Sequence, residues 1–253
     1  MSGPSKMAST EPSDEILFYD IASAPPVRPY APNTWKVRYA LNFKRANFVT
    51  QWVDMADVTS TRKSLGVDAV DSFPNGEPYY TLPVIKDTST NTFLGDSFGI
   101  AVYLNRKYQD GPPLFRQPIG LYAAFNARID SIFTTHRLLF TDGQPLNPET
   151  AERTKAELCR RTGKTWDELT VRGEERRKEL SAYQVALGEA AKYFSFSHGP
   201  FIGGAEPDYA DFIVGGWLMF LSQTVAEWEE IRTWHDGVWG RLHNALEPYR
   251  GTW

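Results

Sequence analysis

The sequence contains a single cysteine, Cys159, and its four histidines are scattered along 253 residues. One thiol excludes an internal disulfide framework and a multi-cysteine metal site, and the histidines show no spacing typical of metal ligands. No apolar run is long enough to cross a membrane, and the first residues lack the apolar centre of a signal peptide. The net charge of −4 gives no indication of nucleic-acid binding. These absences favour a cytoplasmic protein that binds no metal, nucleic acid or membrane.

Aromatic residues, by contrast, are abundant, at 14% of the chain within a hydrophobic fraction of 42%. This composition can fill the core of one large domain or two small ones, and it permits an aromatic-lined cavity. Residues 1–14 are small, polar and proline-containing, so they are predicted to form a disordered tail.

The first half of the chain alternates between strand and helix patterns. Residues 16–22 (ILFYDIA) are a short apolar run that suits a buried strand, and residues 33–44 have helical spacing. Residues 46–55 return to the alternation of a strand. This order predicts a βαβ unit, with a parallel strand pair and a right-handed crossover.

The same half continues with a polar helix near 57–66, a hairpin within 81–96 and a helix over 96–110. Residues 15–110 are therefore predicted to form an α/β domain with a mixed four-stranded sheet. A proline-rich linker follows at 111–116.

Residues 117–253 are predicted to form an all-helical domain. Apolar stripes at spacings of three and four run along 119–140 and 172–196. Residues 211–225 are apolar on all sides, which predicts the central buried helix. Asp208 is expected to cap that helix, with Asp211 three positions later completing a variant of the capping box.

Two short motifs of the first domain could bind a ligand. The Leu82-Pro83 bond leads into a strand, where a cis proline exposes the preceding backbone for pairing with an extended ligand; an ordinary trans proline is the alternative. Asp96 and Ser97 open a helix, whose free N–H groups favour a carboxylate ligand, while Asp96 could hold an ammonium group. The alternative for this pair is simple helix capping.

Together these features, over residues 16 to about 245, resemble the cytosolic glutathione transferases, which join a thioredoxin-like domain to an all-helical domain. The resemblance implies that Pro83 is cis and that the backbone of Leu82 pairs with the cysteinyl part of glutathione. It also implies that Asp96 and Ser97 bind the γ-glutamyl end.

Three strings, PNTWKVRYALNFK, YYTLPVIKD and DSFGIAVYLN, are most similar to the fungal etherase-like FuA class, which is related to bacterial lignin β-etherases. This resemblance implies glutathione as co-substrate, a hydrophobic site for aromatic or phenolic compounds, and a homodimer. It does not predict ether cleavage, which depends on pocket geometry.

Such an enzyme must lower the pKa of the glutathione thiol from about 8.5, because only the thiolate is a good nucleophile. After the first strand the chain offers Ser23, Tyr30, Asn33 and Thr34, and of these Ser23, Asn33 and Thr34 are the candidates for stabilising the thiolate. Many members of the fungal class carry serine before PNTWK, where this chain has Ala31. Alanine is a poor N-cap, so Asn33 is expected to cap the helix and to start it one or two residues later.

Lys36 is placed to attract a carboxylate of glutathione, or else it is a solvated lysine on a helix surface. Cys159 lies in a charged helix of the second domain and is interpreted as inert, and His136 as packed rather than catalytic. The second substrate is expected between the domains, where the aromatic and apolar candidates are Tyr30, Trp35, Phe125, Ile129 and Phe133.

The sequence therefore favours a transferase that conjugates glutathione to hydrophobic aromatic compounds or uses it to reduce peroxides. A low-turnover ligandin-type binding protein for phenolics or glutathione conjugates is the second hypothesis. A purely structural interaction module is the third, and it predicts no affinity for glutathione.

Overall fold

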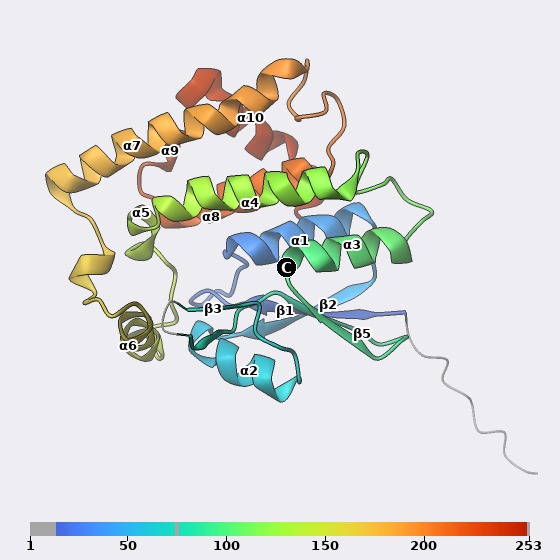
Figure 1. Cartoon of the computed structure of the whole chain (residues 1–253), viewed down its shortest axis with the longest axis horizontal. Helices are drawn as coiled ribbons and strands as arrows, with labels where there is room; N and C mark the ends of the chain where they lie inside the picture. Colours follow the sequence, from blue (N-terminus) through green and yellow to red (C-terminus); the bar gives the residue numbers. More distant parts are fainter. Residues whose placement is uncertain (1–13, 74–75, 252–253) are drawn as a thin grey trace, which may run out of the picture.

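The computed structural model describes residues 14–73 and 76–251. The N-terminal half of the chain forms a sheet with helices on both faces, and the bundle of long helices of the C-terminal half lies above it (Figure 1). Helices α1 and α3 lie between the sheet and the bundle, and α2 covers the opposite face of the sheet. The predicted tail, apart from Asp14, lies outside the described residues.

The N-terminal domain contains the predicted mixed four-stranded sheet, in the order β2-β1-β5-β6. Strands β1 and β2 are parallel, whereas β5 is antiparallel to both β1 and β6. A small antiparallel pair, β3 and β4, was not expected from the sequence. The elements are β1 (Ile16–Ile21), α1 (Pro32–Phe43), β2 (Phe48–Val53), α2 (Val58–Ser64), β3 (Asp71–Ser72), β4 (Pro78–Tyr79), β5 (Val84–Asp87), β6 (Thr92–Gly95) and α3 (Ser97–Lys107).

The described part of the second half is helical, as predicted. The gap between the end of α3 and the start of α4 brackets the predicted linker at 111–116. No helix of the described chain is both long and apolar enough to cross a membrane. The helices are α4 (Ile119–Thr135), α5 (Leu138–Thr141), α6 (Ala151–Thr162), α7 (Gly173–Ala191), α8 (Tyr209–Thr224), α9 (Trp228–Ile231) and α10 (Trp234–Ala245).

Helix α8 is the buried central helix that the sequence predicts. Its capping box is confirmed: the Asp208 carboxylate accepts from the backbone at the helix start, and the Asp211 carboxylate accepts from the Asp208 N–H. Burial raises the pKa of Asp211 to about 7, against the opposing effect of its hydrogen bonds to backbone N–H groups.

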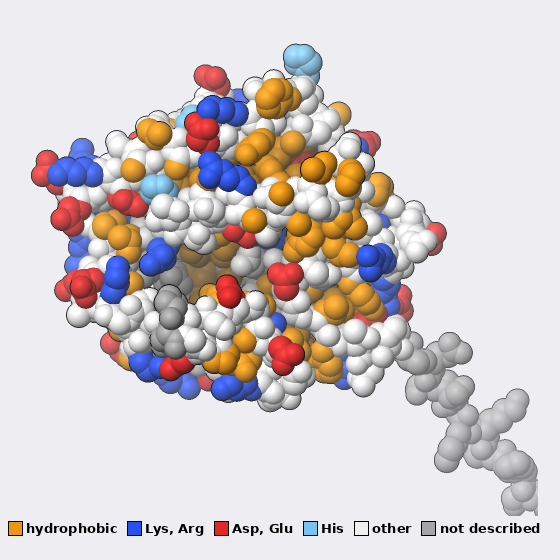
Figure 2. Space-filling view, in the orientation of Figure 1, with side chains coloured by type: hydrophobic (Ala, Val, Ile, Leu, Met, Phe, Trp, Pro, Cys, Tyr) orange, Lys and Arg blue, Asp and Glu red, His pale blue; other side chains and the backbone are white. Residues whose placement is uncertain are grey.

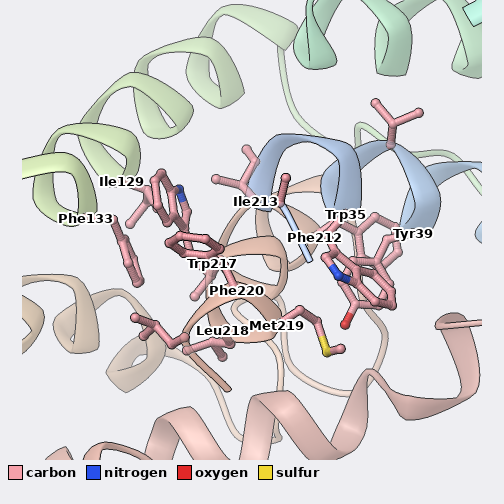
Figure 3. Packing of buried hydrophobic residues seen from close by; sticks show 14 of the residues in the cluster. Trp35, Tyr39, Ile129, Phe133, Phe212, Ile213, Trp217, Leu218, Met219 and Phe220 are labelled. Atoms are coloured by element: carbon pink, nitrogen blue, oxygen red, sulfur yellow. The ribbon is translucent and has the colours of Figure 1, made fainter. Parts of the chain in front are cut away.

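Helix α8 packs closely against α1, which fixes the position of the α1 N-terminus. A Cβ atom at Gly216 would lie 2.5 Å from the carbonyl oxygen of Pro32, so glycine is needed for this approach. Tyr39 of α1 stacks on Phe212 of α8 at 5.5 Å between ring centroids (Figure 3). The two domains are therefore closely packed along this helix pair.

Candidate functional site

A small pocket lies beside the Leu82-Pro83 bond, which is cis as the resemblance implies. The pocket has a volume of about 210 Å³ and is also lined by Val70, Asp71, Tyr79 and Thr81. Five of the predicted site residues, from three separate segments, meet there: Asn33, Leu82, Pro83, Asp96 and Ser97.

The backbone next to this pocket is held by Arg62 of α2, which is almost fully buried. Its guanidinium donates to the carbonyl of Thr81, directly before Leu82, and its Nε donates to the carbonyl of Asp68 at 2.8 Å. Burial lowers the pKa of Arg62, against the attraction of nearby acidic groups. Gly95 leaves room for this side chain, because a Cβ atom there would lie 2.1 Å from Arg62 Nη2.

The acid-serine pair opens α3 with an unusual backbone. Asp96 has a φ of 72°, which is uncommon for a residue other than glycine, and its Oδ2 accepts from the Gly99 N–H at 2.8 Å. The Ser97 carbonyl accepts from the Tyr209 hydroxyl at 3.0 Å, so α8 also fixes the start of α3. Asp96 therefore both caps α3 and lines the pocket.

Helix α1 begins at Pro32, so the expectation that Asn33 caps a later start is wrong. Ala31 is the N-cap and offers no side-chain hydrogen bond. Proline at the first helical position already has a helical φ. It also has no N–H group that would need an acceptor, so the helix can start there. The N–H groups of Asn33 and Thr34 then have no acceptor within the helix.

The three predicted donors to sulfur occupy different environments. Asn33 lines the pocket, and its Oδ1 atom is buried without a partner among the described residues. The Ser23 hydroxyl closes a turn instead: it donates to the Ala24 carbonyl and accepts from the Arg28 N–H, both at 2.8 Å. The Thr34 side chain is fully buried, and its hydroxyl donates to the Ala31 carbonyl at 3.0 Å.

Lys36 is not a solvated surface lysine, because it is fully buried between the domains. Its Nζ lies 2.6 Å from Asp130 Oδ1 and 3.0 Å from Asn126 Oδ1. Burial lowers the pKa of Lys36, while the neighbouring Asp130 opposes that change. The indole N–H of Trp217 donates to the same Asp130 oxygen at 2.7 Å. Lys36 thus belongs to a polar contact between α1, α4 and α8, and it does not line the pocket beside Pro83.

A second pocket, about 210 Å³ in volume and with mostly apolar walls, is lined in part by Pro32, the residue next to Asn33. Figure 2 shows a hollow between the two layers, left of centre, with hydrophobic side chains at its floor. The pocket is lined by Pro32, Thr134, Arg137, Phe140, Thr141, Gln144, Leu158, Thr162, Leu169, Trp217 and Phe220.

The five residues predicted to bind the second substrate do not line this pocket. Trp35 and Ile129 are core residues. Tyr30 stacks on Phe220 at 6.4 Å between centroids. Phe133 stacks on Trp217 at 5.0 Å (Figure 3), so Tyr30 and Phe133 each contact an aromatic residue that lines the pocket. Phe125 lines a different cavity, of about 390 Å³, with Leu121 and Tyr122.

Polar contacts to the N-terminal domain hold α6, one wall of the second pocket. The Thr150 hydroxyl donates to Asp54 at 2.8 Å, and Arg153 pairs with Asp57 at 2.9 Å. Arg160 pairs with Glu77 at 3.1 Å. This wall was not predicted, because α6 has a charged pattern with few apolar positions.

Another cavity, of about 580 Å³, is lined by residues of the helical domain. Its two arginines are paired: Arg176 with Glu227 at 2.6 Å and Arg172 with Asp142 at 3.6 Å.

His136 is buried and lies 2.8 Å from Glu179, which agrees with a packed role.

Comparison with known proteins agrees with this geometry. The sequence model of the glutathione S-transferase N-terminal domain matches residues 30–107, and that of the C-terminal domain matches residues 121–249. The chain belongs to the glutathione S-transferase family. The N-terminal match contains all five residues of the pocket beside Pro83 that the sequence predicted.

Similar members of this glutathione S-transferase family come from fungi. CsGST63524 of Ceriporiopsis subvermispora, solved in complex with glutathione, is 32% identical with a TM-score of 0.83, covering 94% of this chain and 98% of its own. GSTFuA2 of Phanerochaete chrysosporium is 29% identical with a TM-score of 0.81, covering 95% of this chain and 100% of its own. The glutathione S-transferase-like protein ustS of Aspergillus flavus is 28% identical over 94% of this chain and 92% of its own length.

Proposed function

We propose that this protein binds glutathione in the pocket beside Pro83 and transfers it to hydrophobic aromatic or phenolic electrophiles, or uses it to reduce peroxides. The observation that carries the proposal is that adjacent residues line the two pockets: Asn33 lines the first and Pro32 the second. A thiol at the start of α1 would therefore face a bound electrophile directly, which supplies the proximity that catalysis needs.

Glutathione would lie extended across the first pocket. Its γ-glutamyl end would bind at Asp96 and Ser97, which supply a carboxylate for the ammonium and helix N–H groups for the carboxylate. Its cysteinyl part would pair with the backbone of Leu82, next to the cis peptide bond. The related CsGST63524 was solved in complex with glutathione, which supports glutathione as the ligand.

The thiolate would be stabilised by Asn33 and by the N-terminus of α1. The N–H groups of Asn33 and Thr34 lack helical acceptors, and Ala31 gives them no cap. The helix dipole and these donors favour an anion at this position. The Ser23 and Thr34 hydroxyls already serve local contacts, so we retain Asn33 as the side chain that contacts sulfur.

In the conjugation reaction, the thiol loses its proton to solvent and the thiolate forms a carbon–sulfur bond with the electrophile. The leaving group departs with the bonding electron pair, or, in an addition, the substrate takes up a proton. With a hydroperoxide, the thiolate attacks the terminal oxygen and an alcohol leaves. A second glutathione then releases water and forms glutathione disulfide.

Asn33→Ala tests this assignment. The variant should lower kcat/KM for conjugation of 1-chloro-2,4-dinitrobenzene about tenfold, the cost of one hydrogen bond to a charged group. Ser23→Ala is the matched control and should change kcat/KM less than about twofold. Equal rates in the wild type and Asn33→Ala would contradict the role of Asn33.

A ligandin-type binding protein is the second candidate, and Ala31 is the observation that favours it. Without a hydroxyl at this position, the site could bind glutathione conjugates or phenolics with little turnover. Tight binding of phenolics without measurable conjugation or peroxide reduction would support this candidate over the transferase.

We also propose a cytoplasmic homodimer, on the basis of the family resemblance. Sedimentation equilibrium of the purified chain tests the dimer, because a mass of one chain at micromolar concentration would contradict it. Cell fractionation with a cytoplasmic marker tests the location.

A further inference from the structure

The polar groups of the pocket at Pro32 are distributed unevenly. Among the described residues that line it, Arg137 is the one cation and none is acidic. The walls on either side are apolar or aromatic, from Phe140, Trp217 and Phe220. A ligand here would meet a hydrophobic surface and a single positive charge.

Arg137 lies between α4 and α5, directly before Leu138, and is exposed to solvent. No described residue forms an ion pair or a side-chain hydrogen bond with its guanidinium. The three arginines of α6 differ, because Arg153, Arg160 and Arg161 each pair with a carboxylate. An unpaired guanidinium with five N–H donors is suited to bind a planar anionic group.

The threonines of the pocket do not compete as donors. The hydroxyls of Thr134, Thr141 and Thr162 each donate to a carbonyl four residues earlier, at 2.7, 3.1 and 2.7 Å. Each hydroxyl proton is therefore occupied, which leaves these groups as acceptors toward the pocket. Arg137 and the amide of Gln144 remain as donors, and only Arg137 is charged.

We propose that this pocket selects electrophiles with an aromatic body and an anionic head, a carboxylate or phenolate, and that Arg137 binds that head. The proposal rests on the transferase function and narrows its substrate class. The aromatic body packs against Trp217 and Phe220, and the anionic oxygens accept from the Arg137 guanidinium.

A matched pair of reactive compounds tests the selection during turnover: 4-chloro-3-nitrobenzoate and the neutral 4-chloro-3-nitrobenzamide. In both, the thiolate forms a bond to the ring carbon that carries chlorine, chloride leaves, and the thiol proton goes to solvent. The wild type should give the larger kcat/KM with the benzoate, after correction for the uncatalysed rates. Arg137→Gln should lower kcat/KM about tenfold for the benzoate and less than about twofold for the benzamide.

The control is Arg128→Gln, which removes the same charge from an exposed position of α4 that does not line the pocket. It should leave the ratio of the two kcat/KM values unchanged. An equal loss for both compounds in Arg137→Gln, or no loss for either, would overturn the proposal.

An unreactive pair separates this proposal from the transferase function. Calorimetric titration with 2-naphthoate and 2-naphthamide measures binding without chemistry. The wild type should bind the naphthoate more tightly, and Arg137→Gln should remove that preference. Suppose that neither aryl chloride is conjugated, but that tighter binding of the naphthoate than of the naphthamide depends on Arg137. The transferase function then fails and the anionic site stands. Equal binding of both naphthalenes to the wild type would refute the anionic site whatever the turnover.

Discussion

Ala31 and Asn33 illustrate how single residues set the chemistry at the start of α1. A serine at position 31 would accept a hydrogen bond from the first turn, whereas the alanine methyl group cannot. The helix nevertheless begins there, because Pro32 suits the first helical position. The N–H groups of the first turn remain open to a ligand, and Asn33 adds a side-chain amide beside them.

The sequence revealed the chemistry of these residues better than their orientation. The motifs around Leu82 and Asp96 could be identified from the sequence because family strings and cap signals are local in sequence. On residue type alone, the hydroxyls of Ser23 and Thr34 are as suitable as Asn33, and only their turn and helix contacts distinguish them. Side-chain direction depends on backbone geometry that a residue list does not contain.

Tyr30→Phe is expected to stabilise the protein. The Tyr30 hydroxyl is buried without a partner among the described residues, and burial raises the pKa of the phenol, so it stays protonated. Removing a buried unsatisfied hydroxyl should increase the free energy of unfolding by about 1 kcal/mol. Urea denaturation measures the gain, and conjugation rates should not change. A large loss of activity would show that this hydroxyl, rather than Asn33, contacts the thiol.

At the scale of helices, the contact between α1, α4 and α8 orders the second pocket. Asp130 of α4 accepts from both Lys36 and Trp217, which places the indole that lines the pocket. The apolar pattern of α8 predicted its burial on all sides, so no face could be assigned to a substrate in advance. Trp217 and Phe220 were therefore missed as pocket residues.

Helix ends were harder to predict than helices. The stripe over 119–140 reads as one helix, and no glycine or proline interrupts it between Tyr122 and Phe140. The structure nevertheless divides it into α4 and α5 around His136, which is buried against Glu179 of α7. A tertiary contact thus accompanies a break that local propensity did not signal, and Arg137 lies at this break.

Asp130→Asn should destabilise the protein by about 3 kcal/mol, because it leaves the buried Lys36 ammonium without its anion. Chemical denaturation gives this value. Adding Lys36→Met to Asp130→Asn should recover part of the loss, since the uncompensated charge is then gone. A change below about 0.5 kcal/mol in the single variant would show that the pair contributes little.

At the scale of the whole molecule, α1 packs against α8 between the two domains and contributes to both pockets, since Asn33 lines the first and Pro32 the second. The mixed four-stranded sheet, the parallel pair of β1 and β2, the hairpin of β5 and β6 and the division into a sheet domain and a helical domain were predicted from pattern and resemblance, whereas the strand order was not. The second pocket was not, because α1, the α4–α5 segment, α6 and α8 all contribute to it. A cavity built from several segments depends on packing angles, which hydrophobic periodicity does not encode.

The stability of the whole fold should depend on pH through His243. Burial, with the nearby Arg250, lowers the pKa of His243 to about 4 from 6.5. Near these pH values the folded state therefore binds fewer protons than the unfolded state. The contribution of neutral His243 to the free energy of unfolding is present above pH 6.5 and is lost as the pH falls toward 4. Between pH 8 and 5, the wild type should lose about 2 kcal/mol more than His243→Gln.

The comparison with His243→Gln is needed because Asp211 acts in the opposite direction. Its raised pKa of about 7 adds stability as the pH falls, and this contribution is common to both proteins. Urea denaturation at several pH values gives the difference. Parallel pH profiles for the two proteins would show that His243 is not buried as a neutral group.

The most direct test of the central claim is an ultraviolet titration of the glutathione thiolate in the complex. If the start of α1 stabilises the thiolate, the pKa of the bound thiol should lie at least one unit below the free value of about 8.5, and Asn33→Ala should raise it. A bound thiol with an unshifted pKa would contradict this account and leave a glutathione-binding protein without an activated nucleophile.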